Sequence, residues 1–125
     1  MYQKTVPFGF GLIIIGSEIL DGRIRDRHFE NTRKLLSERN HQLRYSMILI
    51  DEQGLILEKL KWAMMRYEPF FCCGGIGSTP DDYTRFCAAE AAGLPLEFHE
   101  EGVDILKKRF GKRATPPRLK MVEFP

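Results

Sequence analysis

The sequence predicts an α/β fold in which short parallel strands alternate with helices. Three apolar stretches are each followed by a segment with apolar residues at helical spacing. The first stretch is continuously apolar, as in a strand covered on both faces of a parallel sheet. Polar clusters follow each stretch at its carboxyl end. Parallel strands with right-handed crossovers bring such clusters to one edge of the sheet, where open α/β folds bind ligands.

The first strand–helix unit is predicted at residues 10–15 and 28–39. Residues 10–15 are rich in isoleucine. Asp26 precedes the helix and is expected to cap it, because a carboxylate can accept the free N–H groups of a first turn. The buried side of this helix is expected to be Phe29, Leu35 and Leu36.

The second unit is predicted as a strand over residues 43–50 and a helix over residues 53–66. Asp51 closes the strand. Apolar residues then recur every three or four positions, which predicts one buried helical face. That face comprises Ile56, Leu60, Ala63, Met64 and Tyr67.

The third unit begins with the strand "FFCC" at residues 70–73, after Pro69. A helix is predicted over residues 79–92, with Thr79 as N-cap and Pro80 at its first position. Asp81 and Asp82 would then lie in the positive first turn. Gly93 and Pro95 are expected to end this helix.

The C-terminal part predicts one more helix, over residues 100–110. Its expected buried residues are Val103, Leu106 and Phe110. The remaining tail shows little periodic pattern, so no further element is predicted there.

Length and composition restrict the class of protein. The chain has 125 residues, of which 43% are hydrophobic and 29% charged, as expected for one soluble globular domain. A net charge of +2 does not indicate a nucleic-acid partner. No apolar run approaches the roughly 20 residues of a membrane span. The run at residues 8–16 lacks a small-residue cleavage site and is interpreted as a buried strand, not a signal peptide.

The chain has three cysteines, Cys72, Cys73 and Cys87. No CxxC pair or histidine-rich spacing indicates zinc. They are interpreted as small buried hydrophobic residues in a reducing cytoplasm. Cys72 and Cys73 are neighbours in a strand, so they are expected to face opposite sides of the sheet.

The segment "CCGGIGSTPDDYT", residues 72–84, is the strongest functional motif. A glycine loop that enters a helix N-terminus presents free N–H groups to an anion, commonly a phosphate. It is not a P-loop, because no Lys-Ser/Thr follows, and its glycine spacing differs from the dinucleotide fingerprint. A tight turn followed by a well-capped helix is the structural alternative.

The carboxylates near this loop point to a metal ion. Asp81 and Asp82 would repel a bound phosphate unless a divalent cation lay between them, and Mg²⁺ uses one or two carboxylates with phosphate oxygens and water. Asp51 and Glu18 could face the same space. Four arginines are candidate phosphate partners, with a solvated surface role as the alternative: Arg23, Arg25, Arg27 and Arg85.

Two stretches resemble a known family. "IIIGSEILDGRIRD" and "CCGGIGSTPDDYT" resemble the molybdopterin-binding (MoaB/Mog) domain. They are more closely similar to the N-terminal domain of the competence/damage-inducible CinA proteins. Residues 16–26, Asp51 and residues 74–84 match the three CinA motifs, and the resemblance covers nearly the whole chain as a single domain, residues 1–125.

This resemblance implies a three-layer α/β sandwich with a mostly parallel sheet. It implies molybdopterin or a related pterin or nucleotide as ligand, and Mg²⁺ as cofactor. Asp51 and Asp82 match the two aspartates that support the family's chemistry, so they are the candidate catalytic and metal-binding residues. The candidate ligand-binding residues are Gly16, Ser17, Glu18, Gly74, Gly75, Gly77, Ser78, Thr79 and Asp81. Relatives form dimers or trimers, so a homo-oligomer is expected.

The chain departs from the CinA pattern in three places. Ser17 stands where the pattern has aspartate, and His28 replaces the usual asparagine. The chain also stops at "RLKMVEFP", where relatives continue into further strands, so a fold truncated at its C-terminus is expected. A free-standing CinA-type domain would lack the deamidase domain of full CinA proteins, so deamidation is not expected.

Three functional hypotheses follow. The first is a domain that binds a molybdopterin-like or dinucleotide ligand. The second is a metal-dependent pyrophosphatase acting on ADP-ribose or a related dinucleotide. The third is a non-catalytic, self-associating module whose loop only caps a helix. Ser17 and the missing C-terminal segment weaken the second more than the first, because turnover needs a complete metal shell.

Overall fold

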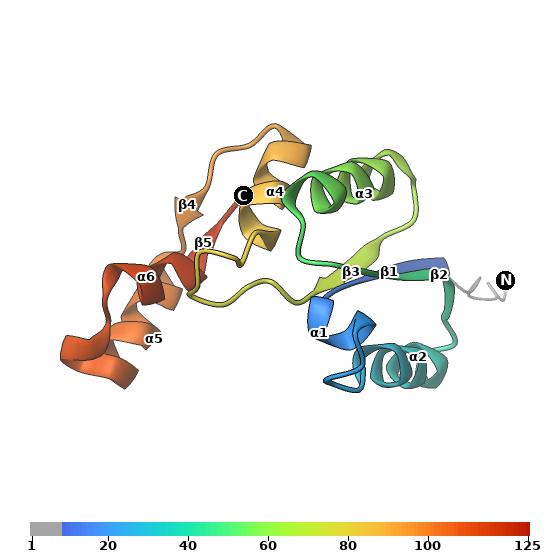
Figure 1. Ribbon diagram of the computed structural model, residues 1–125, viewed down its shortest axis with the longest axis horizontal. Helices are drawn as coiled ribbons and strands as arrows, with labels where there is room; N and C mark the ends of the chain where they lie inside the picture. The colour runs from blue at the N-terminus through green and yellow to red at the C-terminus, as the bar shows by residue number, and fades with distance from the viewer. Residues whose placement is uncertain (1–8) are drawn as a thin grey trace, which may run out of the picture.

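The computed structural model describes residues 9–125 and contains a three-stranded parallel sheet with helices on both faces (Figure 1). Strand β1 (Gly9–Ile15) lies between β2 (Gln42–Leu49) and β3 (Phe70–Cys73). Both pairings are parallel. The predicted α/β class with parallel strands is therefore confirmed.

The helices form the two outer layers. Helix α2 (His28–Glu38) covers one face of the sheet, and α3 (Gln53–Met65) covers the other, beside α4 (Thr84–Ala92) (Figure 1). This is the predicted three-layer sandwich. None of the helices within residues 9–125 is long and apolar enough to cross a membrane.

The core forms on both faces of β1, because successive side chains of a strand point to opposite faces. Ile13 and Ile15 pack with three buried residues of α3 and with Cys87 of α4. The alternate residues Leu12 and Ile14 are fully buried on the α2 side. The isoleucine-rich run therefore forms the central strand because it supplies apolar side chains to both layers.

The two neighbouring cysteines face opposite sides of β3, as predicted. Cys72 packs against the α3 side of the core, and burial raises the pKa of its thiol to about 12. Cys73 instead lines a groove with Leu35 and Leu36 of α2. Within residues 9–125 the cysteines are free thiols.

Part of the predicted core is exposed. Leu36 is buried, but Phe29 and Leu35 are 43% and 53% exposed. Strand β3 is the last strand of this sheet, so no described strand pairs with its outer edge beside Leu35. Leu35 therefore lines an open groove of about 310 Å³ with Phe71 and Cys73.

The buried face of α3 is narrower than predicted. Ile56, Leu60 and Ala63 are buried, whereas Met64 is 39% and Tyr67 86% exposed. Helix α3 ends at Met65, so Tyr67 lies beyond the helix and off its apolar stripe. The apolar stripe therefore ends before Tyr67, the last residue that the helical spacing predicts.

The prediction of a helix starting at Thr79 is wrong. Helix α4 begins at Thr84, and Thr79 and Asp82 instead close a turn in which the Asp82 N–H donates to the Thr79 carbonyl (3.1 Å). The predicted end is confirmed, because Gly93 follows the helix with a left-handed φ of 67°.

The C-terminal part forms a small lobe beside α4 (Figure 1). Strands β4 (Glu97–Phe98) and β5 (Glu123–Phe124) pair antiparallel. Helix α5 (Glu100–Phe110) has the predicted bounds, and the His99 Nδ1 atom accepts the Gly102 N–H (3.1 Å) at its start. Val103, Leu106 and Phe110 are only half-buried, because α5 packs mainly on short neighbours.

Several short elements were not predicted. The tail contains the 3-10 helix η1 (Gly111–Arg113), α6 (Pro116–Leu119), the 3-10 helix η2 (Lys120–Val122) and β5. Helix α1 (Ser17–Leu20) follows β1 directly. Elements of two to four residues carry too little periodicity to be read from sequence.

Candidate functional site

Three segments at the carboxyl ends of the strands surround one hollow of about 570 Å³, which we call the inner hollow. Helix α1, directly after β1, contributes Ser17 and Glu18, and the loop after β2 contributes Asp51. The loop after β3 contributes most of the remaining wall, namely Gly74, Gly75, Thr79, Asp81 and Asp82. Parallel topology therefore brings together carboxylates that are far apart in the sequence.

Ser17 and Asp51 join the first two loops through a pair of hydrogen bonds. The Ser17 N–H donates to the Asp51 Oδ2 atom (2.9 Å), and the Asp51 N–H donates to the Ser17 Oγ atom (2.9 Å). A serine hydroxyl can accept this second bond without adding charge. The Asp51 Oδ1 atom makes no hydrogen bond to residues 9–125, so it is available to a ligand.

Thr84, the first residue of α4, holds the first part of the glycine loop. Its hydroxyl donates to the Gly74 carbonyl (2.6 Å), and its N–H donates to the Gly75 carbonyl (3.1 Å). Both glycines have left-handed φ angles, 94° and 64°. Glycine is required where the backbone takes this conformation so close to another element.

Arg85 holds the second part of the loop. Its guanidinium donates to the Ile76 carbonyl through Nη1 and to the Gly77 carbonyl through Nη2 (3.1 Å). Partial burial lowers the pKa of Arg85, while the charges of Asp82 and Glu123 oppose that shift. Arg85 is therefore directed at the loop backbone, which is not the phosphate contact considered from the sequence.

Four successive loop carbonyls are thus bound toward α4. The peptide bonds are trans, so the N–H of each following residue points the opposite way. The Gly77 N–H bonds to the Asp82 carboxylate. The N–H groups of Gly75, Ile76 and Ser78 donate to no residue within 9–125. Free backbone N–H groups of this kind can bind an anion.

Asp82 closes the turn that follows the loop. Its Oδ2 atom accepts the Thr79 N–H (2.9 Å) and the Thr79 hydroxyl (2.7 Å). Partial burial favours protonation, but the bonds from Thr79 and Gly77 and the charge of Arg85 outweigh it and lower the pKa of Asp82. Asp82 is therefore ionised at neutral pH. Its carboxylate stabilises the turn that starts at Thr79 and does not cap a helix.

The carboxylates suit a hydrated cation held together with a ligand. Within residues 9–125, no three His, Cys, Asp or Glu side chains are grouped to hold a metal by themselves. Asp51 and Asp82 nevertheless line the same hollow. Mg²⁺ typically takes one or two carboxylates and completes its shell with phosphate oxygens and water. These two residues could hold Mg²⁺ once a phosphate is present.

Some predicted site residues lie elsewhere, and one residue was missed. Gly77 and Ser78 line a separate hollow of about 210 Å³ with Arg85. The Gly16 N–H donates to the Leu49 carbonyl (2.9 Å), so this N–H group extends the pairing of β1 with β2 and is not free to bind a ligand. His28, at the start of α2, lines the inner hollow. In the sequence, the only signal that His28 belongs to the site was its position, where the CinA pattern has asparagine.

Comparison with known proteins identifies relatives of this chain. The model of a family described as a probable molybdopterin binding domain matches residues 11–123. A CinA-like protein of Sulfurihydrogenibium is 35% identical over 91% of this chain and 29% of its own length. The chain spans less than half of the curated relatives it matches.

Solved structures show the same architecture. A CinA protein from Thermoplasma acidophilum, described as of unknown function, has a TM-score of 0.84 and 29% identity, covering 95% of this chain and 71% of its own. MoaB from Thermus thermophilus, described as a molybdopterin biosynthesis enzyme, has a TM-score of 0.61 and 18% identity, covering 90% and 70%. At that identity, the second likeness concerns the fold alone.

Proposed function

Since this chain belongs to the family of probable molybdopterin-binding domains, we propose that it binds a phosphorylated pterin or nucleotide, with Mg²⁺, at the loop of residues 74–82. The ligand's phosphate would accept a hydrogen bond from the free N–H group of Gly75, which lines the inner hollow with Asp51 and Asp82. Mg²⁺ would link that phosphate to Asp51 and Asp82. The three free thiols agree with action in a reducing cytoplasm.

The observation that carries this proposal is the way the loop carbonyls are bound. Thr84 and Arg85 hold four of them toward α4, so the opposite N–H groups are oriented before any ligand arrives. A loop that served only to join β3 to α4 would not need this arrangement. The carboxylates alone would repel a phosphate, which is why the proposal includes a cation.

We propose binding, and not hydrolysis, as the primary function. One oxygen of Asp51 and one of Asp82 are occupied by backbone N–H groups. Ser17 occupies the position where a further carboxylate would stand in the CinA pattern. Once the remaining oxygens of Asp51 and Asp82 hold the cation, neither of these two residues is left to act as a general base toward water.

Titration calorimetry on the wild-type chain tests the proposal. AMP, ADP-ribose and molybdopterin would each be titrated with and without Mg²⁺, and the mixtures would then be assayed for cleavage products. We expect Mg²⁺-dependent binding of at least one ligand and no cleavage. No binding of any ligand with Mg²⁺ would refute the proposal, and cleavage of ADP-ribose would establish the pyrophosphatase alternative.

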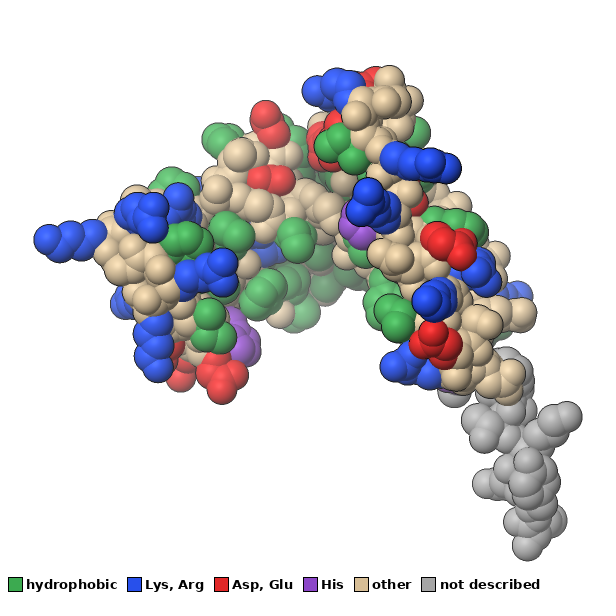
Figure 2. Space-filling model, turned by 90° about the horizontal axis from the view of Figure 1, so that it is seen from below, with side chains coloured by type: hydrophobic (Ala, Val, Ile, Leu, Met, Phe, Trp, Pro, Cys, Tyr) green, Lys and Arg blue, Asp and Glu red, His purple; other side chains and the backbone are tan. Residues whose placement is uncertain are grey.

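We also propose that the chain self-associates through the groove beside β3. Hydrophobic side chains gather on the concave side of the molecule (Figure 2). Leu35 and Phe71, both in the groove, are 53% and 44% exposed, and the outer edge of β3 has no described partner strand. Exposed apolar surface beside an open strand edge favours association.

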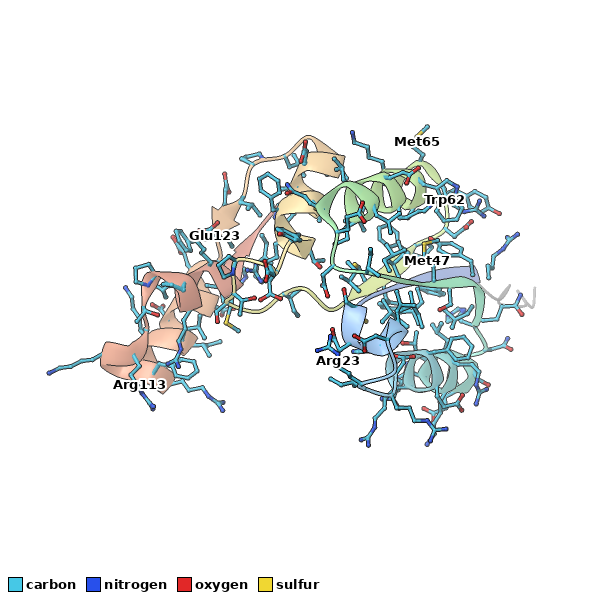
Figure 3. All side chains as sticks on the ribbon, viewed as in Figure 1. Arg23, Met47, Trp62, Met65, Arg113 and Glu123 are labelled. Atoms are coloured by element: carbon cyan, nitrogen blue, oxygen red, sulfur yellow. The ribbon has the colours of Figure 1, made fainter. Side chains whose placement is uncertain are left out.

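Light scattering of two variants at matched concentrations checks this expectation. Leu35→Arg should shift the chain to monomer, because it places a charge in the groove beside Arg39. Met65→Arg is the control, because Met65 is 89% exposed at the end of α3 (Figure 3). A wild-type chain that stays monomeric at high concentration would show that the groove is not a self-association surface.

A further inference from the structure

The C-terminal lobe carries a concentration of positive charge that the net charge of the chain hides. The chain has 19 Lys and Arg residues and 17 Asp and Glu residues. Seven of these cations and none of the acids fall within residues 107–120, namely Lys107, Lys108, Arg109, Lys112, Arg113, Arg118 and Lys120. The rest of the chain therefore has more acids than cations, and its charge is net negative.

The fold gathers these cations at one end of the molecule. They belong to the last turn of α5, to η1, to α6 and to the start of η2, and α5 packs against both η1 and α6. Lys and Arg side chains cluster on the lobe at the left of Figure 2, whereas cations and acids are interspersed on the opposite side of the molecule. Arg113 lies at the end of the lobe that is far from the sheet (Figure 3).

Arg118 holds this part of the lobe together. Its guanidinium carbon lies 4.5 Å from the centre of the Phe110 ring, and its Nη1 atom donates to the Arg113 carbonyl (3.1 Å). Phe110 ends α5 and Arg113 ends η1, so these contacts fix the turn between them against the end of the helix. Five exposed cations extend from this support, and we call them the basic surface: Lys107, Lys108, Arg109, Lys112 and Arg113.

The electrostatics of α5 explain only part of the basic surface. Acids in the first turn of a helix and cations in its last turn are the order that the helix dipole favours, and α5 has this order. Lys112 and Arg113 lie beyond the helix, where the effect of the dipole falls off. They add to the positive charge without this local reason.

The acids of the lobe leave the basic surface uncompensated. Asp104 is the nearest acid along α5, one turn before Lys107 and Lys108. None of the five cations nevertheless forms an ion pair with a residue of the described range 9–125. The remaining acids lie at the start of α5 or in the paired strands β4 and β5 next to that start, namely Glu97, Glu100, Glu101 and Glu123.

The basic surface suits a phosphate backbone better than a protein or a membrane. The cores of protein interfaces are poor in Lys and are centred on apolar anchors, whereas Phe110 is half-buried and covered by Arg118. A helix that binds a membrane presents an apolar face, but Ile105 is the one large apolar side chain of α5 that is exposed, at 61%. Exposed Lys and Arg without apolar neighbours are the residues that contact nucleic-acid phosphates.

We infer that the basic surface binds the sugar–phosphate backbone of a nucleic acid without reading its sequence. The net negative charge of the rest of the chain orients the lobe toward the nucleic acid and turns the carboxylates of the inner hollow away from it. The inner hollow is lined by no residue of the lobe, so the two sites are separate. The distribution of charge thus points to a partner that the net charge of +2 did not indicate.

Fluorescence anisotropy with a labelled DNA duplex of about 20 base pairs and arbitrary sequence tests the basic surface. Wild-type affinity should fall about 40-fold between 50 and 200 mM salt if three phosphates are neutralised. Lys108→Gln combined with Lys112→Gln should weaken binding at least tenfold at 50 mM salt. Lys34→Gln combined with Lys61→Gln removes two exposed lysines elsewhere, so the net charge changes equally, and binding should change less than about twofold.

Three outcomes would overturn the assignment of the basic surface. The first is equal affinity of the two double variants for the duplex. The second is binding of phosphatidylserine vesicles or of polyglutamate by a wild-type chain that does not bind the duplex. The third is displacement of the duplex by saturating AMP with Mg²⁺, because it would place the duplex at the glycine loop. Failure of AMP itself to bind would count against the proposed function alone.

Discussion

Gly74→Ala is expected to destabilise the fold by about 3 kcal/mol or more. An added Cβ atom would lie 2.0 Å from the Ile15 carbonyl oxygen, which belongs to the backbone of the central strand. Gly74 also has a φ of 94°, a conformation that alanine adopts only with strain. Backbone strain costs on the order of 1–3 kcal/mol, and overpacking typically adds a similar amount.

The matched control adds the same methyl group where the structure has room for it. Gly54 lies in the first turn of α3, and a Cβ atom there would meet nothing within 4 Å. Gly54→Ala should therefore stabilise the fold by roughly 0.5–1 kcal/mol, because alanine loses less backbone entropy than glycine in a helix. Urea unfolding of both variants measures the contrast. Equal stabilities would contradict the close approach of the glycine loop to β1.

Asp82→Asn is expected to reduce Mg²⁺-dependent ligand affinity tenfold or more, about 1.4 kcal/mol. Asparagine keeps an acceptor for the Thr79 N–H, so the turn should survive with a modest loss of stability. It removes the negative charge that would hold the cation. Without Mg²⁺ the sign reverses, because the same loss of charge reduces repulsion of the phosphate.

The opposite responses with and without Mg²⁺ make this test specific. Titration calorimetry with AMP would be run under both conditions on Asp82→Asn and on Asp104→Asn. Asp104 is exposed on α5 and does not line the inner hollow, so its variant should bind like the wild type. Equal weakening by Asp82→Asn in both conditions would mean that Asp82 only shapes the turn.

Local periodicity was enough to predict the alternating strands and helices of this fold, whereas its three layers were implied by the family resemblance. The run at residues 10–15 and the helix that ends at Gly93 depend on features that act within a few residues. Burial depends on neighbours that the sequence does not position, which is why Leu35 and Met64 are exposed. The short C-terminal elements are stabilised by packing between segments, so no local pattern in the sequence predicts them.

The start of α4 shows how two local preferences can compete. Thr79, Pro80, Asp81 and Asp82 match the usual order of a helix start. Here Thr79 donates twice to Asp82, and that bonding holds a turn for several residues before the helix begins at Thr84. Side chains that can bond nearby backbone groups often favour turns over helix.

The sequence motifs contain many of the residues that line the inner hollow, but they did not predict the contacts between those residues. Motif matching identified Asp51, Asp82 and the glycines before any geometry was known. Ser17 bonds Asp51, which is far away in the sequence, and Arg85 bonds carbonyls across the glycine loop. Neither contact could be predicted from the type of residue alone. Only the folded arrangement distinguishes a phosphate-binding arginine from one that orients backbone.

The bound carbonyls of the glycine loop also have a kinetic consequence. A loop whose dipoles are fixed in advance needs no slow rearrangement on encounter, and little ordering entropy is lost when the ligand arrives. Association should then be set by diffusion and by the charges around the entrance, and differences in affinity between ligands should appear mainly as differences in residence time. Thr84 and Arg85 would thus govern how quickly the site is filled without touching what fills it.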